Sequence, residues 1–252
     1  EYDLTSFEKG LEELGIALSG EQKKQFITYY ELLVEKKSDD LTAITEYDEV
    51  ILKHFLDSLS IVKAGCFDQK KLAGKSLIDI GTGAGFGIPL KIAFPQLKIT
   101  LLDSLNKRVN FLNEVIQSLG LKEVTAVHGR AEDLAKQKEY RENYDFCVSR
   151  AVANLSTLSE YCIPFVKVDG SFVSYNPQED EELSQAENAV KFLGGKVTDV
   201  VRFPLMDTDM DRSFVVIKKT KPNCKKIPKK GWTAVKRTVG VMRLAFHNSN
   251  TK

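Results

Sequence analysis

The sequence predicts an α/β fold in which a mainly parallel β-sheet carries helices on both faces, ends in an antiparallel hairpin and follows an N-terminal helical extension. Three observations support this prediction. Short apolar runs alternate with helical stretches from residue 76 onward, a glycine-rich turn follows the first run, and no helix separates the last two runs. We expect a helical region at 1–68, an α/β domain at 69–220 and a basic tail at 221–252.

The helical extension contains three predicted helices. The first, at 4–15, begins with a Thr-Ser cap, has a glutamate behind the cap and ends at a glycine. The second, at 19–37, places large side chains on one face: Phe26, Tyr29, Tyr30 and Leu33. The third, at 49–65, repeats this amphipathic pattern and therefore belongs to the same helical layer.

The α/β part alternates strands with helices. Strands are expected at 76–80, 99–103, 124–127, 144–149 and 170–175. The corresponding helices are expected near 86–94, 106–119, 131–138, 153–167 and 179–193. The apolar runs at 195–203 and 212–219 are joined by the acidic stretch PLMDTDMD, so they predict an antiparallel hairpin that closes the sheet.

Length and composition exclude several classes of protein. With 252 residues, of which 42% are hydrophobic and 28% charged, the chain is neither disordered nor fibrous. No apolar run approaches the roughly 20 residues that span a bilayer, and the sequence begins without a signal-peptide pattern, so we expect a cytoplasmic protein. Its cysteines and histidines are scattered, which predicts neither a disulfide framework nor a metal site. We expect a monomer.

The charge is unevenly distributed. From residue 212 to residue 252 there are 12 Lys or Arg and no Asp or Glu, whereas residues 1–211 carry 24 basic and 35 acidic side chains. Such a basic block is either a solvated end or an arm that binds phosphates. The nucleic-acid interpretation and the solvated end are equally favoured by charge alone.

The glycine-rich stretch LIDIGTGAGFGIPL at 77–90 does not fit the common nucleotide motifs. A dinucleotide-binding turn needs a third glycine at a position that Phe86 or Ile88 occupies here, depending on the register. The phosphate-binding P-loop needs a Lys-Ser or Lys-Thr pair, and none follows. A nicotinamide oxidoreductase is therefore disfavoured.

What stands instead is Asp79 followed by Gly81, Gly83 and Gly85 at a strand-to-helix turn. This pattern resembles the first motif of class I S-adenosylmethionine-dependent methyltransferases, which are Rossmann-like. Asp103 ends the next strand, where an acid that binds ribose hydroxyls belongs. By this resemblance the domain at 69–220 binds S-adenosylmethionine. The alternative is a tight turn that merely packs.

Two further strand ends supply candidate residues. Ala131 and Glu132 follow the third strand, where a backbone amide, a small apolar surface and a carboxylate would hold adenine. The alternative for Glu132 is a first-turn acid that stabilises a helix. Arg150 follows the fourth strand at the edge where such folds bind ligands. It either pairs with a core acid or positions substrate or cofactor, and we favour the second role.

Six segments together resemble the RsmG (GidB) family of bacterial small-subunit rRNA methyltransferases over nearly the whole chain: KHFLDSL, DIGTGAGFGIPL, LLDSLNKRVNFL, GRAEDL, YDFCVSRAVANLSTLSEYCIPFVKVDGSFV and RSFVVIKK. The resemblance implies a product, N7-methylguanosine in the decoding-region hairpin of 16S rRNA, and a partner, 16S rRNA or the small ribosomal subunit. It also implies cofactor contacts at matching positions: Gly81, Phe86, Ala131, Glu132 and Arg150.

The residues agree with this chemistry by a separate argument. The Asn/Asp-Pro-Pro-aromatic motif of exocyclic-amine methylation is missing after the fourth strand, and Cys147 has no neighbouring base that would make it a nucleophile. Guanine N7 carries a lone pair and no proton, so its methylation needs alignment rather than a general base. We therefore expect no acid–base dyad and no catalytic residue beyond the positioning role of Arg150.

Side chains cannot reach the N7 edge inside an A-form groove, so the target guanine must be unstacked. We expect the basic tail to bind the phosphates that flank this guanine. The candidates for phosphate binding are Lys225, Lys226, Lys229, Lys230, Lys236 and Arg237. Trp232 either stacks on a base or anchors the tail by packing. His54 and Asp57 fit a hydrogen-bonded pair within one helix that docks the helical extension; a substrate contact is the alternative.

The sequence also departs from the family pattern. Residues 86–89 read Phe-Gly-Ile-Pro, one residue shorter than the usual Phe-Pro-Gly-Ile-Pro, and Asn176 stands where the family commonly has a lysine. The stretch VEKKSDDLT and the residues after Trp232 differ too. These differences concern the acceptor pocket. Two other functions therefore stay open: methylation of another RNA or a small molecule, and RNA binding without catalysis.

Overall fold

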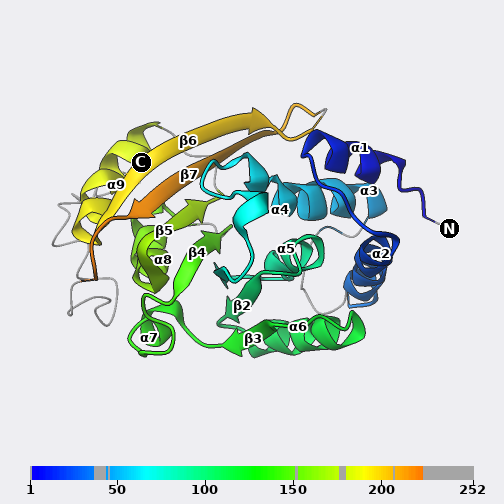
Figure 1. Cartoon of the computed structure of the whole chain (residues 1–252), viewed down its shortest axis with the longest axis horizontal. Helices are drawn as coiled ribbons and strands as arrows, with labels where there is room; N and C mark the ends of the chain where they lie inside the picture. The colour runs from blue at the N-terminus through cyan, green and yellow to red at the C-terminus, as the bar shows by residue number, and fades with distance from the viewer. Residues whose placement is uncertain are drawn as a thin grey trace, which may run out of the picture.

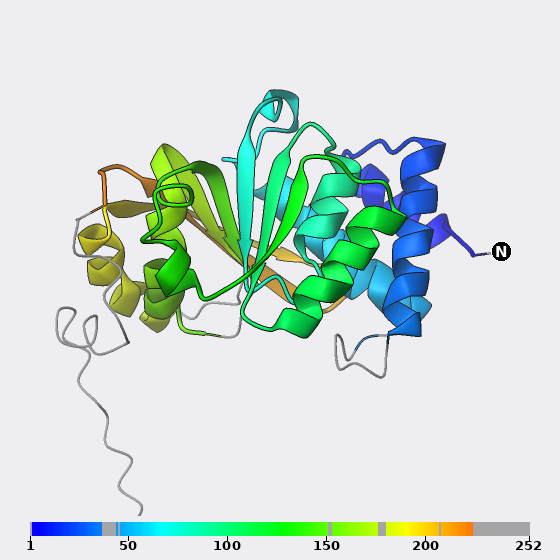
Figure 2. The same ribbon diagram turned by 90° about the horizontal axis from the view of Figure 1, so that it is seen from below.

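A computed structural model describes residues 2–36, 44, 46–150, 153–175, 180–206 and 208–223. Its centre is a seven-stranded sheet of order β3-β2-β1-β4-β5-β7-β6 (Figure 1). Helices cover both faces of this sheet (Figure 2). The predicted α/β architecture is therefore present, with the helical extension packed on the side of one sheet face.

The sheet is mainly parallel. Its parallel strands are β1 (Ser76–Ile80), β2 (Lys98–Asp103), β3 (Val124–His128), β4 (Tyr144–Ser149) and β5 (Val166–Ser174). Antiparallel pairing adds β7 (Asp211–Lys219) beside β5 and β6 (Gly195–Pro204) at the edge. The predicted closing hairpin is confirmed, and the carboxyl ends of the five parallel strands share one edge, called the carboxyl edge below.

The helices between the strands are α5 (Gly87–Ala93), α6 (Asn106–Ser118), α7 (Ala131–Leu134), α8 (Leu155–Cys162) and α9 (Asp180–Phe192). One hydrophobic cluster joins α5, α6 and the helical extension to one sheet face, and a second joins α7, α8 and α9 to the other. Apolar residues of the parallel strands divide between these two clusters, as expected for a sheet covered on both sides.

Two expected helices were too long. The helix expected at 131–138 ends at Leu134, and Arg141 donates from Nη1 to the Ala135 carbonyl at 3.0 Å, which ties off the following turn. The helix expected at 153–167 ends at Cys162, because Pro164 starts a short 3₁₀ turn (Ile163–Phe165) that cannot continue an α-helix. Strand β5 consequently begins at Val166 rather than at residue 170.

The helical extension begins with α1 (Thr5–Glu13) and α2 (Gly20–Glu35). Helix α2 starts with a capping box in which the Ser19 side chain accepts from the Gln22 amide and the Gln22 side chain accepts from the Ser19 amide. The Gln22 side-chain amide also donates to the Ile92 carbonyl at 2.7 Å, which fastens α2 to the end of α5. A short 3₁₀ turn (Gln69–Lys71) leads into β1.

The third predicted helix exists but is irregular. It consists of α3 (Tyr47–Val50), a π-helical turn (Ile51–Leu56), α4 (Asp57–Leu59) and a 3₁₀ turn (Ser60–Lys63). A π-turn adds a residue to the helical turn and changes the direction in which later side chains point. His54 lies inside this π-helical turn and Asp57 directly follows it, and these two residues are the pair that the sequence singled out.

The helical extension shares its core with the α/β part. The ring of Tyr29 on α2 stacks on Phe55 at 5.4 Å between centroids, and Phe26 packs against the same ring at 5.0 Å. These residues belong to one hydrophobic cluster with Phe86 and Leu112 of the α/β part. None of the helices in the described part of the chain is long and apolar enough to cross a membrane.

Candidate functional site

The glycine turn connects β1 to α5 at the carboxyl edge. Gly81, Gly83 and Gly85 all have positive φ angles, of 70°, 62° and 104°, which residues with a side chain adopt with strain. The turn is fixed from below because the Gly81 amide donates to the Leu102 carbonyl of β2 at 2.9 Å. The glycine spacing therefore produces a tight turn with its backbone exposed to the carboxyl edge.

Gly85 lies where no side chain fits. A Cβ atom built on it would come within 2.6 Å of Leu112 Cδ2 and 2.9 Å of the Tyr29 hydroxyl. Below the turn, the buried Asp79 carboxylate accepts a hydrogen bond from the Gly87 amide at 2.8 Å. Burial raises the pKa of Asp79 to about 7. Asp79 thus ties the start of α5 to the end of β1.

Asp103 closes the other side of the turn. Its Oδ2 accepts from the Gly83 amide at 2.9 Å and from Arg108 Nη1 at 3.3 Å, and its Oδ1 accepts from the Leu105 amide at 2.9 Å. An ionised carboxylate has about four acceptor positions, so three protein donors leave it capacity for a ribose hydroxyl. Leu105, two residues after Asp103, is 44% exposed.

A cavity of about 390 Å³ opens among the ends of β1, β2, β3 and β4. Its lining includes four predicted cofactor residues, Gly81, Asp103, Ala131 and Glu132. Ala131 is the first residue of α7, so its amide has no acceptor within the helix. We call this space the first cavity. Its acid, small side chain and available amide suit an adenosine group.

A second cavity of about 180 Å³ lies on the other side of the glycine turn. Three predicted residues, Gly83, Phe86 and Arg150, line it together with Ile44, Lys53 and His54 from the helical extension. Gly81 lines both cavities, so they meet at that residue. A larger space of about 670 Å³ lies between α9 and β6, away from all of these residues.

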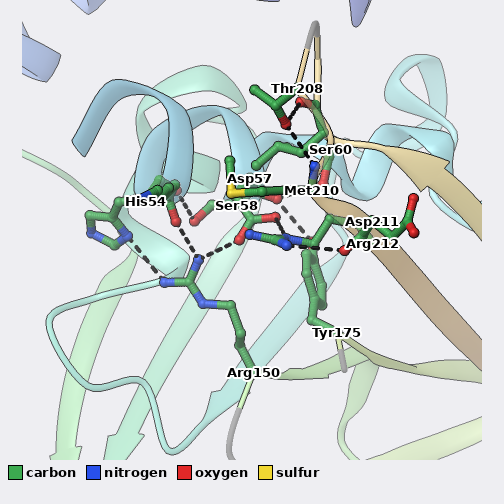
Figure 3. Close-up of polar contacts among 12 residues, drawn as sticks. His54, Asp57, Ser58, Ser60, Arg150, Tyr175, Thr208, Met210, Asp211 and Arg212 are labelled. Carbon is green, nitrogen blue, oxygen red and sulfur yellow. Dashed lines mark hydrogen bonds and ion pairs between the residues drawn. The ribbon is translucent and has the colours of Figure 1, made fainter. Parts of the chain in front are cut away.

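Arg150 connects three parts of the protein at the second cavity (Figure 3). Its Nη1 forms an ion pair with Asp57 Oδ2 at 3.0 Å, and its Nη2 lies 3.3 Å from His54 Nδ1. The guanidinium also lies 4.7 Å from the centroid of the Phe86 ring, a cation–π distance. The core-acid partner that we considered for Arg150 therefore exists, and the arginine faces a cavity as well.

His54 and Asp57 are joined through Arg150, which differs from the pair within one helix that we expected. The Tyr29 hydroxyl has one hydrogen and donates it to the Ala84 carbonyl at 2.5 Å. His54 Nε2, 2.9 Å from that hydroxyl, must then be the protonated nitrogen, and Nδ1 accepts from Arg150. Burial and the Arg150 charge hold the pKa of His54 well below its usual value.

Several residues of this network were missed by sequence reasoning. Arg212 on β7 donates from Nε to Asp57 Oδ1 at 2.9 Å, and the buried Tyr175 hydroxyl donates to the Ser58 carbonyl at 3.1 Å. The Tyr175 ring also meets Phe86 edge-on at 4.4 Å. Arg212 stood in the segment RSFVVIKK, but nothing in one sequence pairs it with Asp57. Tyr29 was identified only as part of an apolar helix face.

The predicted RNA-binding positions lie outside the described residues. These are Lys225, Lys226, Lys229, Lys230, Trp232, Lys236 and Arg237, and Asn176 lies outside as well. Within the described part of the chain, no group of three or more His, Cys, Asp or Glu side chains is placed to hold a metal ion.

Comparison with known proteins gives a consistent result. A family model described as rRNA small subunit methyltransferase G matches residues 22–210. A protein named ribosomal RNA small subunit methyltransferase G from Lachnoclostridium phytofermentans is 51% identical over 237 residues, which are 93% of this chain and 96% of that protein. One of the same name from Alkaliphilus metalliredigens is 48% identical over 233 residues, covering 91% and 96%.

Solved structures are similar at the level of the fold. A variant of MtNAS in complex with S-adenosylmethionine has a TM-score of 0.52 at 15% identity, covering 79% of this chain and 76% of that one. A variant of the 16S rRNA (adenine(1408)-N(1))-methyltransferase from Catenulisporales acidiphilia has a TM-score of 0.51 at 14% identity, covering 63% and 94%. These likenesses confirm the predicted class I methyltransferase fold.

Proposed function

This chain belongs to the rRNA small subunit methyltransferase G family, and from that premise we propose that it methylates N7 of a guanosine in the decoding-region hairpin of 16S rRNA. The methyl donor is S-adenosylmethionine. The observation that carries the proposal is the meeting of two cavities at Gly81. The first cavity suits an adenosine group. The second is lined by residues that can position a guanine but do not deprotonate it.

In this proposal the first cavity holds the adenosine part of the cofactor. Asp103 accepts a hydrogen bond from a ribose hydroxyl. The Ala131 amide and Glu132 bind the adenine edge, and Leu105 covers one face of the base. Gly81, Gly83 and Gly85 let the backbone approach the methionine part, and Phe86 and Arg150 border it. When bound, the cofactor supplies an electrophilic methyl group on a sulfonium.

The second cavity is proposed to receive the guanine. Among the residues that line this cavity, His54 is the obvious candidate for a base, but its Nε2–H faces Tyr29 and its Nδ1 faces Arg150. N7 attacks through its own lone pair, so the reaction needs no proton acceptor. Holding donor and acceptor in line can supply roughly 7–11 kcal/mol of a barrier. Arg150, held by Asp57 and stacked on Phe86, is proposed to maintain that alignment.

We propose 16S rRNA or the small ribosomal subunit as the partner of a cytoplasmic monomer. Lys225, Lys226, Lys229, Lys230 and Trp232 are proposed to bind the RNA. Strand β7 is antiparallel to β5, so Lys219 and the last described residue, Asn223, lie toward the edge opposite the glycine turn. Contacts made close to Asn223 would therefore touch RNA away from the target guanine.

The test is methyl transfer from labelled S-adenosylmethionine to small-subunit rRNA from cells lacking the enzyme, offered naked and as assembled particles. We expect label at one hairpin guanosine, mapped by strand cleavage specific for N7-methylguanosine. Label on another RNA or on a small molecule would assign the enzyme a different substrate. Salt-dependent RNA binding without binding of S-adenosylmethionine would mean a catalytically silent factor and would overturn the proposal.

A further inference from the structure

Arg130 lies on the rim of the first cavity. Two residues after the end of β3, it immediately precedes α7, and its side chain is exposed while lining the cavity together with Asp103 and Ala131. Ala131 and Glu132, its neighbours, were assigned to the cofactor above. Arg130 itself has no role in that assignment.

Arg130 is unusual among the arginines that the structure describes. Each of the others has an interaction partner: Arg108, Arg150 and Arg212 bind carboxylates, Arg141 binds a carbonyl, and Arg202 has a contact of its own. Arg130 forms no hydrogen bond or ion pair through its side chain with any described residue. Its guanidinium therefore contributes little to holding the fold together.

Local helix stability does not explain an arginine at this position either. Arg130 occupies the N-cap of α7, with φ −93° and ψ 138°, and its side chain makes no capping hydrogen bond. Ser, Thr, Asp and Asn are preferred at an N-cap, and a positive charge is unfavourable beside the amino end of a helix. Its neighbours Glu132 and Asp133 supply the favourable charge for that helix end.

We propose that Arg130 binds a phosphate of the RNA backbone next to the target guanosine and so holds the RNA across the mouth of the first cavity. This inference rests on the proposed function, in which the adenosine end of the cofactor occupies that cavity. Adenosine carries no negative charge, so an exposed guanidinium at this end has no ionic partner in the cofactor. The anion that fits comes from the polynucleotide, and arginine binds phosphate with two parallel N–H groups.

The net charge of most of the chain opposes RNA binding, so a positive group at the carboxyl edge matters. Residues 1–211 carry 24 basic and 35 acidic side chains, so this part of the chain repels a polyanion on average. RNA approaching the carboxyl edge needs local positive groups there. Arg130 supplies one on the first cavity, whereas Lys53 on the second cavity is already paired with Glu49. The two cavities meet at Gly81, so a strand lying over both would pass Arg130.

The experiment compares Arg130→Gln with Lys122→Gln, a matched removal of one positive charge from an exposed lysine at the opposite end of β3. We expect Arg130→Gln to raise the KM for rRNA roughly tenfold. The slope of log affinity against log salt should fall by about 0.7 to 0.9, as for one lost phosphate contact. Lys122→Gln should leave both quantities unchanged. Arg130→Lys keeps the charge and should restore the salt slope.

S-adenosylmethionine affinity is measured on each variant by equilibrium dialysis, and RNA affinity by filter binding without cofactor. Equal KM and salt slope for Arg130→Gln and Lys122→Gln would overturn the inference. A loss of cofactor affinity with an unchanged RNA salt slope would also overturn it, because Arg130 would then belong to the cofactor site. If the wild-type protein transfers no methyl to rRNA, the proposed function fails, yet filter binding still decides whether Arg130 contacts phosphate.

Discussion

Arg212 and Asp57 are 155 positions apart in the chain, and the Nε of the first donates to Oδ1 of the second at 2.9 Å (Figure 3). The other carboxylate oxygen of Asp57 binds Arg150. One buried carboxylate, 4% exposed, therefore joins the helical extension, the end of β4 and the closing hairpin. The position of Arg150 at the second cavity depends on all three.

Replacing Asp57 by Asn should therefore destabilise the protein and disturb the second cavity. Two guanidinium groups would lose their counter-charge, at a cost of about 2 to 4 kcal/mol, since both arginines remain partly exposed to water. Urea denaturation measures the loss, and the KM for rRNA should rise. Asp48→Asn removes an exposed carboxylate from the same segment and should change neither. Equal midpoints for the two variants would contradict this account of Asp57.

The pH dependence of stability should report on His54. Its pKa is depressed in the folded protein, so the unfolded chain binds the proton more tightly, and stability falls as the pH drops below about 6.5. The slope from this residue approaches about 1.4 kcal/mol per pH unit between the two pKa values. Asp79, with its pKa raised to about 7, contributes the opposite slope from about pH 4 to 7.

The comparison of wild type with His54→Gln isolates the histidine contribution, because Asp79 is present in both proteins. We expect the difference in unfolding free energy between them to shrink as the pH falls from 7 to 5. Urea midpoints at four pH values suffice. A difference that is constant over this range would show that His54 is not held neutral.

The glycines of the turn should differ in their tolerance of alanine. Gly83→Ala places a Cβ in open space and costs about 1 kcal/mol for its left-handed backbone. Gly85→Ala adds a collision with Leu112 and the Tyr29 hydroxyl, for a total of about 2 to 4 kcal/mol. Thermal unfolding ranks the two, and S-adenosylmethionine affinity should follow the same order. A reversed order would mean that the close packing at Gly85 is not required.

Asp103→Asn tests the ribose contact. The side-chain NH2 group of asparagine would replace one carboxylate oxygen and face one of the two backbone donors, the Gly83 or the Leu105 N–H, and the charge that strengthens the acceptor for a ribose hydroxyl would be lost. Losing hydrogen bonds to a charged group should weaken S-adenosylmethionine binding roughly 10- to 100-fold. Asp199→Asn, on an exposed position of β6, is the control. Calorimetry that finds equal affinity for both variants would remove Asp103 from the cofactor site.

Ending the chain at Asn223 tests the basic tail. Asn223 itself is fastened, because its amide donates to Glu142 at 2.7 Å and its side chain donates to the Pro164 carbonyl at 2.8 Å. The shortened protein should therefore fold and bind S-adenosylmethionine normally. Its KM for rRNA should rise and its salt dependence should weaken, because several phosphate contacts are lost. An unchanged salt dependence would assign RNA binding to other residues.

Much of the fold could be predicted from the sequence because strand periodicity and the glycine turn are local signals. Strands β1, β2, β3 and β4 and the closing hairpin lie within one residue of their predicted bounds. The start of β5 was placed four residues late, because the apolar run around Pro164 continues the pattern of α8. Periodicity does not distinguish a helix end from a strand start in such a run.

The network around Arg150 could not be predicted, because it depends on geometry that no local pattern encodes. A π-turn over Ile51–Leu56 leaves the apolar pattern readable as an ordinary helix, yet it decides where His54 and Asp57 point. The contacts of Asp57 with Arg150 and Arg212 span 93 and 155 positions. Only the tertiary fold brings such partners together.

The helical extension supplies Ile44, Lys53 and His54 to the wall of the second cavity, and this affects how the enzyme can be recombined. A chimera that took only the segment from β1 onward would inherit the first cavity complete, with its glycine turn, Asp103 and Ala131. It would leave one wall of the second cavity behind. In the proposed function the first cavity holds the methyl donor and the second receives the acceptor, so exchanging either segment alone would change one of these two sites without the other.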